Sequence, residues 1–261
     1  MKIKQYQVDA FTTKVFQGNP AAVCPLEIWL EDDMLQAIAE ENNLSETAFF
    51  VPIATGFNLR WFTPSKEVNL CGHATLAAAH VIYEFMEFKD SVITFSTRSG
   101  DLYVRKQGKL LQMDFPAYNI NTIDNSEVFL KALGARPIKV FADEDYMVVF
   151  DSEATIRSIR PNFELLSLLD LRGVIVTAPG SDVDFVSRFF APKLGIPEDP
   201  VTGSAHCMLA PYWAEKLGKN ILSAKQVSKR GGNISCEVKA DRVVLSGNAV
   251  TFMVADITLE A

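Results

Sequence analysis

The organisation of this chain is clearest in one stretch, Leu70-Cys71-Gly72-His73-Ala74-Thr75-Leu76-Ala77-Ala78-Ala79-His80. It joins an extended run to a helix that is apolar on almost every face, and it places a Cys, a Gly and a His at the first turn of that helix. The first N–H groups of a helix have no intrahelical partners and carry the positive end of the dipole, so this turn can hold a carboxylate. The pattern is equally typical of a buried helix whose small residues pack closely and whose His73 is only a cap.

The composition indicates a folded globular protein with one large domain or two smaller ones. The 261 residues are 48% hydrophobic and 22% charged, which is enough to bury a full core. The net charge of -7 argues against a nucleic-acid partner. Without a long apolar run or a leader-like N-terminus, we expect a cytoplasmic protein with no membrane partner. The four cysteines lack paired CxxC spacing, so we expect free thiols and no structural metal.

Hydrophobic periodicity and turn residues predict an α+β protein with a boundary near residue 118. Before the boundary, the expected strands are 1–8, 14–24, 47–51, 57–62, 92–96, 101–105 and 110–115, and the expected helices are 31–43 and 72–85. After it, helices are expected at 127–133, 164–169 and 203–217, and strands at 138–141, 146–150, 173–178, 183–190 and within 224–259. The halves are therefore 1–118 and 119–261, and the last few residues can pack back on the first half. Pro211 is expected to displace the carbonyl of Cys207 inside its helix.

The two apolar helices belong to an internal repeat. Gly72 and Gly203 are offset by 131 residues, as are the alanines two positions after each. Upstream, Arg60-Trp61-Phe62-Thr63-Pro64 matches Arg188-Phe189-Phe190-Ala191-Pro192 at an offset of 128, so three residues are inserted before the second helix. The repeat predicts two similar halves, each a curved sheet around one central helix.

This repeat gives the opening motif a geometry. If the halves face each other, both helix starts point into one cleft and their N–H groups hold a substrate carboxylate from two sides. His73 then comes from one half and Asp199 from the other. Acid and base groups on opposite sides of a carbanion are what proton transfer between carbons requires.

Four motifs resemble the phenazine-biosynthesis PhzF-like family over the whole chain: Gly18-Asn19-Pro20, Leu44-Ser45-Glu46-Thr47-Ala48-Phe49, Cys71-Gly72-His73-Ala74-Thr75 and Asp199-Pro200-Val201-Thr202-Gly203-Ser204-Ala205. That family is similar in fold to diaminopimelate epimerase. The resemblance implies two pseudo-symmetric α+β halves, each a barrel-like, mostly antiparallel sheet around a central helix, with the active site between them.

The resemblance also implies roles for individual residues. Glu46 is the expected catalytic acid/base, with His73 and Asp199 beside it, although the residues alone leave Glu46 equally a solvated loop charge. The expected substrate-binding residues are Asn19, Gly72, Thr202, Gly203 and Ser204. In the family's namesake reaction, an isomerisation of a dihydro-hydroxyanthranilate, a carboxylate moves a proton between carbons without a cofactor. We therefore expect no cofactor, a small carboxylate-bearing substrate, and a homodimer by analogy with the family.

Three functions remain open at the level of sequence. The first is a cofactor-independent isomerase of a small carboxylic acid that works by carboxylate acid/base catalysis. The second is an epimerase or racemase of an amino or hydroxy acid. Diaminopimelate epimerase uses one cysteine from each half, whereas Thr202 matches Cys71 here at the offset of 131, so a two-thiol racemase is disfavoured and Cys71 is interpreted as a small buried thiol. The third is a non-catalytic member that binds a metabolite or a protein.

Overall fold

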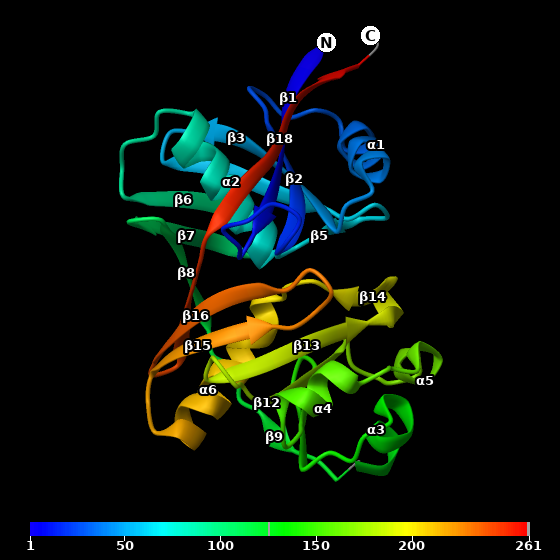
Figure 1. Ribbon diagram of the computed structural model, residues 1–261. Coiled ribbons are helices and arrows are strands. Elements are labelled where there is room, and N and C mark those ends of the chain that lie inside the picture. Colours follow the sequence, from blue (N-terminus) through cyan, green and yellow to red (C-terminus); the bar gives the residue numbers. More distant parts are fainter. Residues whose placement is uncertain (125, 260–261) are drawn as a thin grey trace. The chain divides into compact units, whose positions relative to one another are not determined.

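The chain forms two compact units (Figure 1) in a computed structural model that describes residues 1–124 and 126–259. Unit 1 comprises Met1–Asp114 and the segment that begins at Ser246, and unit 2 comprises Phe115–Leu245. The sequence pattern predicts one boundary at residue 118. Residues 119–261 then form the second half, except that the last few can pack back on the first half. The chain instead returns to unit 1 at Ser246, because its last strand pairs with its first. Asn125 and residues 260–261 of the predicted second half lie outside the described residues.

Unit 1 is a mixed sheet with two helices. Its elements are β1 (Lys2–Ala10), β2 (Asn19–Pro25), α1 (Asp32–Asn42), β3 (Glu46–Ile53), β4 (Gly56–Phe62), β5 (Glu67–Val68), α2 (Gly72–Phe85), β6 (Val92–Thr97), β7 (Gly100–Gln107), β8 (Leu110–Pro116), which leads out of the unit, and β18 (Ala249–Thr258). Strand β1 pairs antiparallel with β2 and β18, and β2 pairs parallel with β3. Strand β4 pairs antiparallel with β3 and β5 and parallel with β6, and β6, β7 and β8 form an antiparallel meander.

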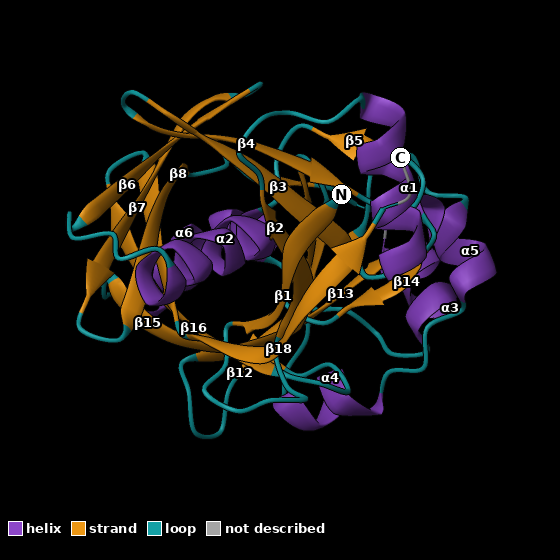
Figure 2. Cartoon of the chain, turned by 90° about the horizontal axis from the view of Figure 1, so that it is seen from above, coloured by secondary structure: helices purple, strands orange, loops and turns teal. Residues whose placement is uncertain are grey.

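Strand alternation sorts the residues of β3 between two layers. Phe49 and Val51 pack with Leu35 and Ile38 of α1 in a buried cluster on one face of the sheet. Side chains two apart along a strand share a face, so Glu46 lies on the opposite face, with Ala48 and Phe50. That face belongs to α2, which contacts β1, β2, β3 and β18 and lies among the curved strands in Figure 2. The sheet thus directs Glu46 toward the central helix.

The loop before β2 differs from the prediction of a strand over 14–24. Strand β2 begins only at Asn19, because Phe16 and Gly18 have φ values of 70° and 68°. A Cβ atom on Gly18 would lie 2.1 Å from the Ala10 carbonyl oxygen, so only glycine fits this close approach. The tight turn places Asn19 at the first position of β2.

Unit 2 repeats the plan of a sheet with one long helix and adds short helices. Its elements are β9 (Asn121–Thr122), α3 (Ser126–Leu133), β10 (Lys139–Ala142), β11 (Tyr146–Val149), α4 (Glu153–Ser158), α5 (Phe163–Ser167), β12 (Val174–Pro179), β13 (Phe185–Ala191), the 3-10 helix η1 (Pro192–Leu194), β14 (Ile196–Asp199), α6 (Gly203–Leu217), β15 (Ile221–Gln226), β16 (Gly232–Lys239) and β17 (Arg242–Gly247). Strand β13 pairs antiparallel with β12 and β14 and parallel with β15, and β15 pairs antiparallel with β16. The α+β prediction is confirmed.

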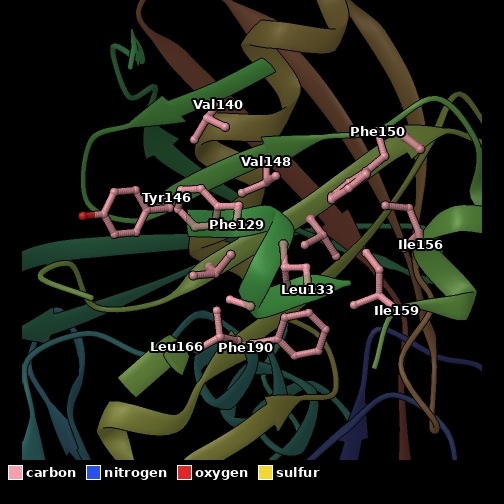
Figure 3. Packing of buried hydrophobic residues seen from close by; sticks show 14 of the residues in the cluster. Phe129, Leu133, Val140, Tyr146, Val148, Phe150, Ile156, Ile159, Leu166 and Phe190 are labelled. Atoms are coloured by element: carbon pink, nitrogen blue, oxygen red, sulfur yellow. The ribbon is translucent and has the colours of Figure 1, made fainter. Parts of the chain in front are cut away.

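Two layers cover the sheet of unit 2. On one face, side chains of α3, α4 and α5 pack against the strands in a buried cluster that includes Phe129, Leu133 and Phe190 (Figure 3). On the other face, Phe185 stacks on Trp213 of α6 at 5.8 Å between ring centroids. Ser187, two residues after Phe185, shares this second face.

The proline inside α6 leaves one backbone carbonyl without its helical donor. Pro211 cannot donate to the carbonyl of Cys207, and that carbonyl accepts a hydrogen bond from Tyr118 N at 3.1 Å instead. The carbonyl that the proline deprives of its helical partner is therefore satisfied by the chain entering unit 2.

The internal repeat extends to buried ion pairs. Arg60 on β4 makes a bidentate pair with Glu67 at the start of β5. Arg188 on β13 makes the same pair with Glu198 on β14, and the separation is ten residues instead of seven. The three-residue insertion predicted from the offsets therefore lies between β13 and β14, where η1 is found. Among the described residues, no helix combines the length and hydropathy needed to cross a bilayer.

Candidate active site

The first turn of α2 brings His73 against Glu46. The Nε2 atom of His73 lies 3.2 Å from Glu46 Oε2, and the two side chains are only 7% and 13% exposed. Ala21 of β2 is the register partner of Glu46, so the starts of the parallel strands β2 and β3 lie side by side. Asn19, which shares a face with Ala21, places its Nδ2 atom 3.2 Å from His73 Nδ1. Three residues that are distant in sequence therefore meet where β2 and β3 begin.

The imidazole of His73 lies between two side chains. The Asn19 amide faces its Nδ1 atom and the Glu46 carboxyl faces its Nε2 atom. Burial lowers the pKa of His73 to about 3. The contact with Glu46 is therefore between a carboxyl group and a neutral imidazole rather than an ion pair. The 3.2 Å approach is close but is not aligned as a hydrogen bond.

The thiol of Cys71 completes a trio that could be considered for metal binding. One ligand atom each from Glu46, Cys71 and His73 lie within 4.8 Å of one another. However, Cys71 Sγ lies 3.5 Å from Nδ1 of the ring, whereas Glu46 faces Nε2. A metal bound at one ring nitrogen lies outward from that nitrogen, so one ion cannot reach all three donors without reorientation. The three groups are arranged around two different nitrogens of one ring rather than around a single metal position.

In unit 2, the first turn of α6 holds Asp199 through its neighbours. Thr202 is the N-cap residue, as Cys71 is for α2, and neither side chain caps its helix. The Thr202 hydroxyl donates to Asp199 Oδ2 at 2.5 Å. Gln226, at the end of β15, bonds both Thr202 and the Asp199 carbonyl. The carboxylate of Asp199 is thus fixed by a buried polar cluster.

Ser204, the next predicted binding residue, contacts a cation. Arg172 Nη2 donates to Ser204 Oγ at 3.1 Å, and the same guanidinium makes a bidentate pair with the buried Asp145. It also lies over the ring of Phe189, 5.8 Å from its centroid. Burial opposes the charge, but the bonds to Asp145 outweigh this effect and the pKa of Arg172 is raised. A fixed positive charge therefore adjoins the start of α6.

The other histidine near this turn has a structural environment. His206 lies one turn into α6 and donates from Nδ1 to the carbonyl of Thr202 at 2.8 Å. The equivalent residue in α2, Thr75, donates from its hydroxyl to the carbonyl of Cys71 at 2.6 Å. Burial lowers the pKa of His206 to about 4. Both side chains tie an N-cap carbonyl to the next turn.

The predicted site residues thus form two groups, one in each unit. The first group is Asn19, Glu46, Gly72 and His73, and the second is Asp199, Thr202, Gly203 and Ser204. A cleft shared by both groups stays a prediction. Sequence reasoning missed Gln226 and Arg172. Neither lies in a recognisable motif, and each reaches the start of α6 only through strand pairing and long-range packing.

A family model described as phenazine biosynthesis-like protein (PhzC-PhzF) matches residues 8–255. The chain belongs to the PhzF family. This PhzF-family protein is 53% identical over 253 residues to a Pseudomonas aeruginosa protein that is named an uncharacterized isomerase. The alignment covers 97% of this chain and 98% of the relative. It is 39% identical to the human phenazine biosynthesis-like domain-containing protein, covering 99% of this chain and 100% of the relative.

Solved structures agree on the fold of the PhzF-family protein. A PhzF-family protein from Enterococcus faecalis has a TM-score of 0.98 and 47% identity, covering 99% of this chain and 100% of that one. A hydroxyproline epimerase from Agrobacterium vitis, solved with bound trans-4-hydroxy-L-proline, has a TM-score of 0.62 and 9% identity, covering 100% of this chain and 93% of that one. At that identity the likeness concerns the fold alone. The prediction of an epimerase-like α+β fold is confirmed.

Proposed function

We propose that this protein is a cofactor-independent isomerase that moves a proton between two carbons of a small carboxylic acid. The observation that supports it most is the contact of Glu46 Oε2 with the neutral ring of His73 at the first turn of α2. The membership in the PhzF family and the isomerase names of close relatives agree with this proposal.

In the proposed reaction, Glu46 is the group that carries the proton. Its carboxylate removes a proton from a carbon, and the C–H electron pair enters the conjugated system of the substrate as a carbanion. The protonated carboxyl then returns the proton to another carbon, and the double bond moves by one position with no atom gained or lost. His73 does not compete for the proton because burial keeps its ring neutral, and its Nε2 atom faces the carboxylate.

The starts of the two long helices are the proposed binding elements. The N–H groups at the first turns of α2 and α6 carry partial positive charge and suit a substrate carboxylate. Gly72 and Gly203 stand at the first position of these helices, where no side chain stands between the backbone and a bound group. In this proposal Asn19, Thr202 and Ser204 line the binding site, and Asp199 is a second acid/base group supplied by unit 2.

The test is an exchange experiment in heavy water with a panel of named acids. The wild-type protein is incubated in D2O with a dihydro-hydroxyanthranilate, L-proline or trans-4-hydroxy-L-proline, and the position of deuterium is read by NMR and mass spectrometry. An isomerase shifts the double bond, and deuterium appears on the new carbon to the extent that the Glu46 proton exchanges with solvent before it is returned. Deuterium at the original carbon with inverted configuration would instead assign an epimerase. Tight binding of a panel member without exchange would contradict catalysis and indicate a binding protein.

A further inference from the structure

A single buried amide organises the start of α6. Gln226 is fully buried, and its Oε1 accepts a hydrogen bond from the backbone N–H of Thr202 at 2.9 Å. Its Nε2 donates to the Asp199 carbonyl at 2.7 Å and to Thr202 Oγ1 at 3.2 Å. These three bonds also fix the orientation of the amide. If it were flipped, an NH2 group would face the Thr202 N–H and an oxygen would face the Asp199 carbonyl, and both bonds would be lost.

The amide also determines the direction of the Thr202 hydroxyl. A hydroxyl has one proton, and the oxygen of Thr202 already accepts from Gln226 Nε2. Its own proton therefore goes to Asp199 Oδ2, 2.5 Å away. Gln226 Nε2 thus holds the oxygen of the hydroxyl whose proton bonds Asp199, and this keeps the carboxylate in one position.

The amide is mounted on a rigid element. Strand β15 lies between β13 and β16, and Gln226 pairs with Ser187 on one side and Gly232 on the other. The segment 199–202 has a second tether to the same hairpin, because Ser228 Oγ donates to the carbonyl of Pro200 at 2.8 Å. A side chain fixed by a central strand sets the geometry of a loop better than the loop itself can.

We propose that Gln226 is the positioning residue of the Asp199 carboxylate and acts through the hydroxyl of Thr202. This inference rests on the proposed function, in which Asp199 takes part in proton transfer. The side chain of Gln226 bonds to Thr202 and Asp199, which are 24 and 27 residues away in sequence, so its effect is on the geometry of Asp199.

The first arm of the test needs no substrate. The protein is labelled with [13C]aspartate, and the side-chain carboxyl resonance of Asp199 is assigned by its loss in Asp199→Asn. We expect this resonance to move in the same direction in Gln226→Leu and in Thr202→Val, and to stay in place in Thr202→Ser, which keeps the hydroxyl. Thr177→Val is the matched control, because Thr177 is buried in the same unit and loses its own hydroxyl bonds to Val186 and Trp213.

The outcomes of the first arm are decisive. An Asp199 resonance that is unchanged in Gln226→Leu, in a protein with wild-type circular dichroism, overturns the proposal. A shift in Thr177→Val equal to that in Gln226→Leu also overturns it, since the effect would then be general loosening of the core. Thr202→Val tests the same connection without an altered amide if Gln226→Leu does not fold.

The second arm measures deuterium exchange in D2O into a panel acid that the wild-type protein labels. We expect Gln226→Leu and Thr202→Val to lower kcat about tenfold with a smaller change in KM, since the group is misplaced rather than lost. The double variant should be no worse than either single one, because the two residues act in one connection. Wild-type kcat in Gln226→Leu together with a large loss in Asp199→Asn overturns the positioning role. Wild-type exchange in Asp199→Asn overturns the proposed role of Asp199 instead, and the resonance shifts still decide what Gln226 does.

Discussion

His73→Gln is expected to make the protein less sensitive to acid. The imidazole has a pKa of 6.5 in the unfolded chain, and burial lowers its pKa to about 3 in the folded protein. Between these values only the unfolded chain binds the proton, so the free energy of unfolding falls by about 1.4 kcal/mol for each pH unit below 6.5. From pH 8 to pH 5, His73 alone therefore costs about 2 kcal/mol. The variant should lack this loss, whatever its stability at pH 8.

Urea unfolding at pH 8, 6 and 5 measures the effect as the change in unfolding free energy with pH. His206→Gln is the parallel variant in unit 2, because burial lowers the pKa of His206 to about 4 and the expected saving is also about 2 kcal/mol at pH 5. The reasoning is refuted if His73→Gln is as sensitive to acid as the wild type. A variant that is more sensitive would show that the folded protein protonates His73 and pairs it with Glu46 as an ion pair.

Three further substitutions test separate parts of the structure. Gly18→Ala should destabilise the protein by several kcal/mol in urea unfolding, because the added Cβ meets the Ala10 carbonyl at 2.1 Å and φ is +68°; a change below about 1 kcal/mol would contradict this close approach. Arg188→Met should cost about 3 kcal/mol, since Glu198 loses its bidentate partner in a mostly buried site, and an equally stable variant would contradict this role. Cys71→Ser should keep the rate of exchange within about tenfold of wild type, because the thiol is interpreted as a packing group. A rate lower by about 100-fold or more, as is typical when a general base is removed, would instead make the thiol a base.

The sequence predicts well where the two long helices begin and that they belong to an internal repeat. The helix starts at Gly72 and Gly203 follow from small residues after an extended run, and α2 and α6 begin at these residues. The two offsets predict a three-residue insertion, and the pairs Arg60–Glu67 and Arg188–Glu198 differ by that number. These features are predictable because they depend on local pattern and on comparison of the chain with itself.

Other features depend on which strands pair. The last strand belongs to unit 1 because β18 pairs with β1, and no local pattern in the sequence specifies that partner. The contact of Glu46 with His73 agrees with the alternation of side chains along β3. Phe49 and Val51 pack toward α1, so Glu46 lies on the opposite face, but this requires knowing which face α1 covers. Gln226 reaches the start of α6 only through the parallel pairing of β13 with β15, so its role could not be predicted from its neighbours in sequence.

The most direct test of proton transfer by Glu46 compares two Glu-to-Gln variants in D2O. Glu46→Gln removes the proposed base with little change in shape, and Glu84→Gln makes the same substitution at a half-exposed glutamate paired with Lys106. On a panel acid that the wild-type protein labels, we predict at least about a 100-fold slower incorporation of deuterium for Glu46→Gln and a wild-type rate for Glu84→Gln. Incorporation by Glu46→Gln within threefold of the wild-type rate would contradict the assignment of Glu46 as the group that carries the proton.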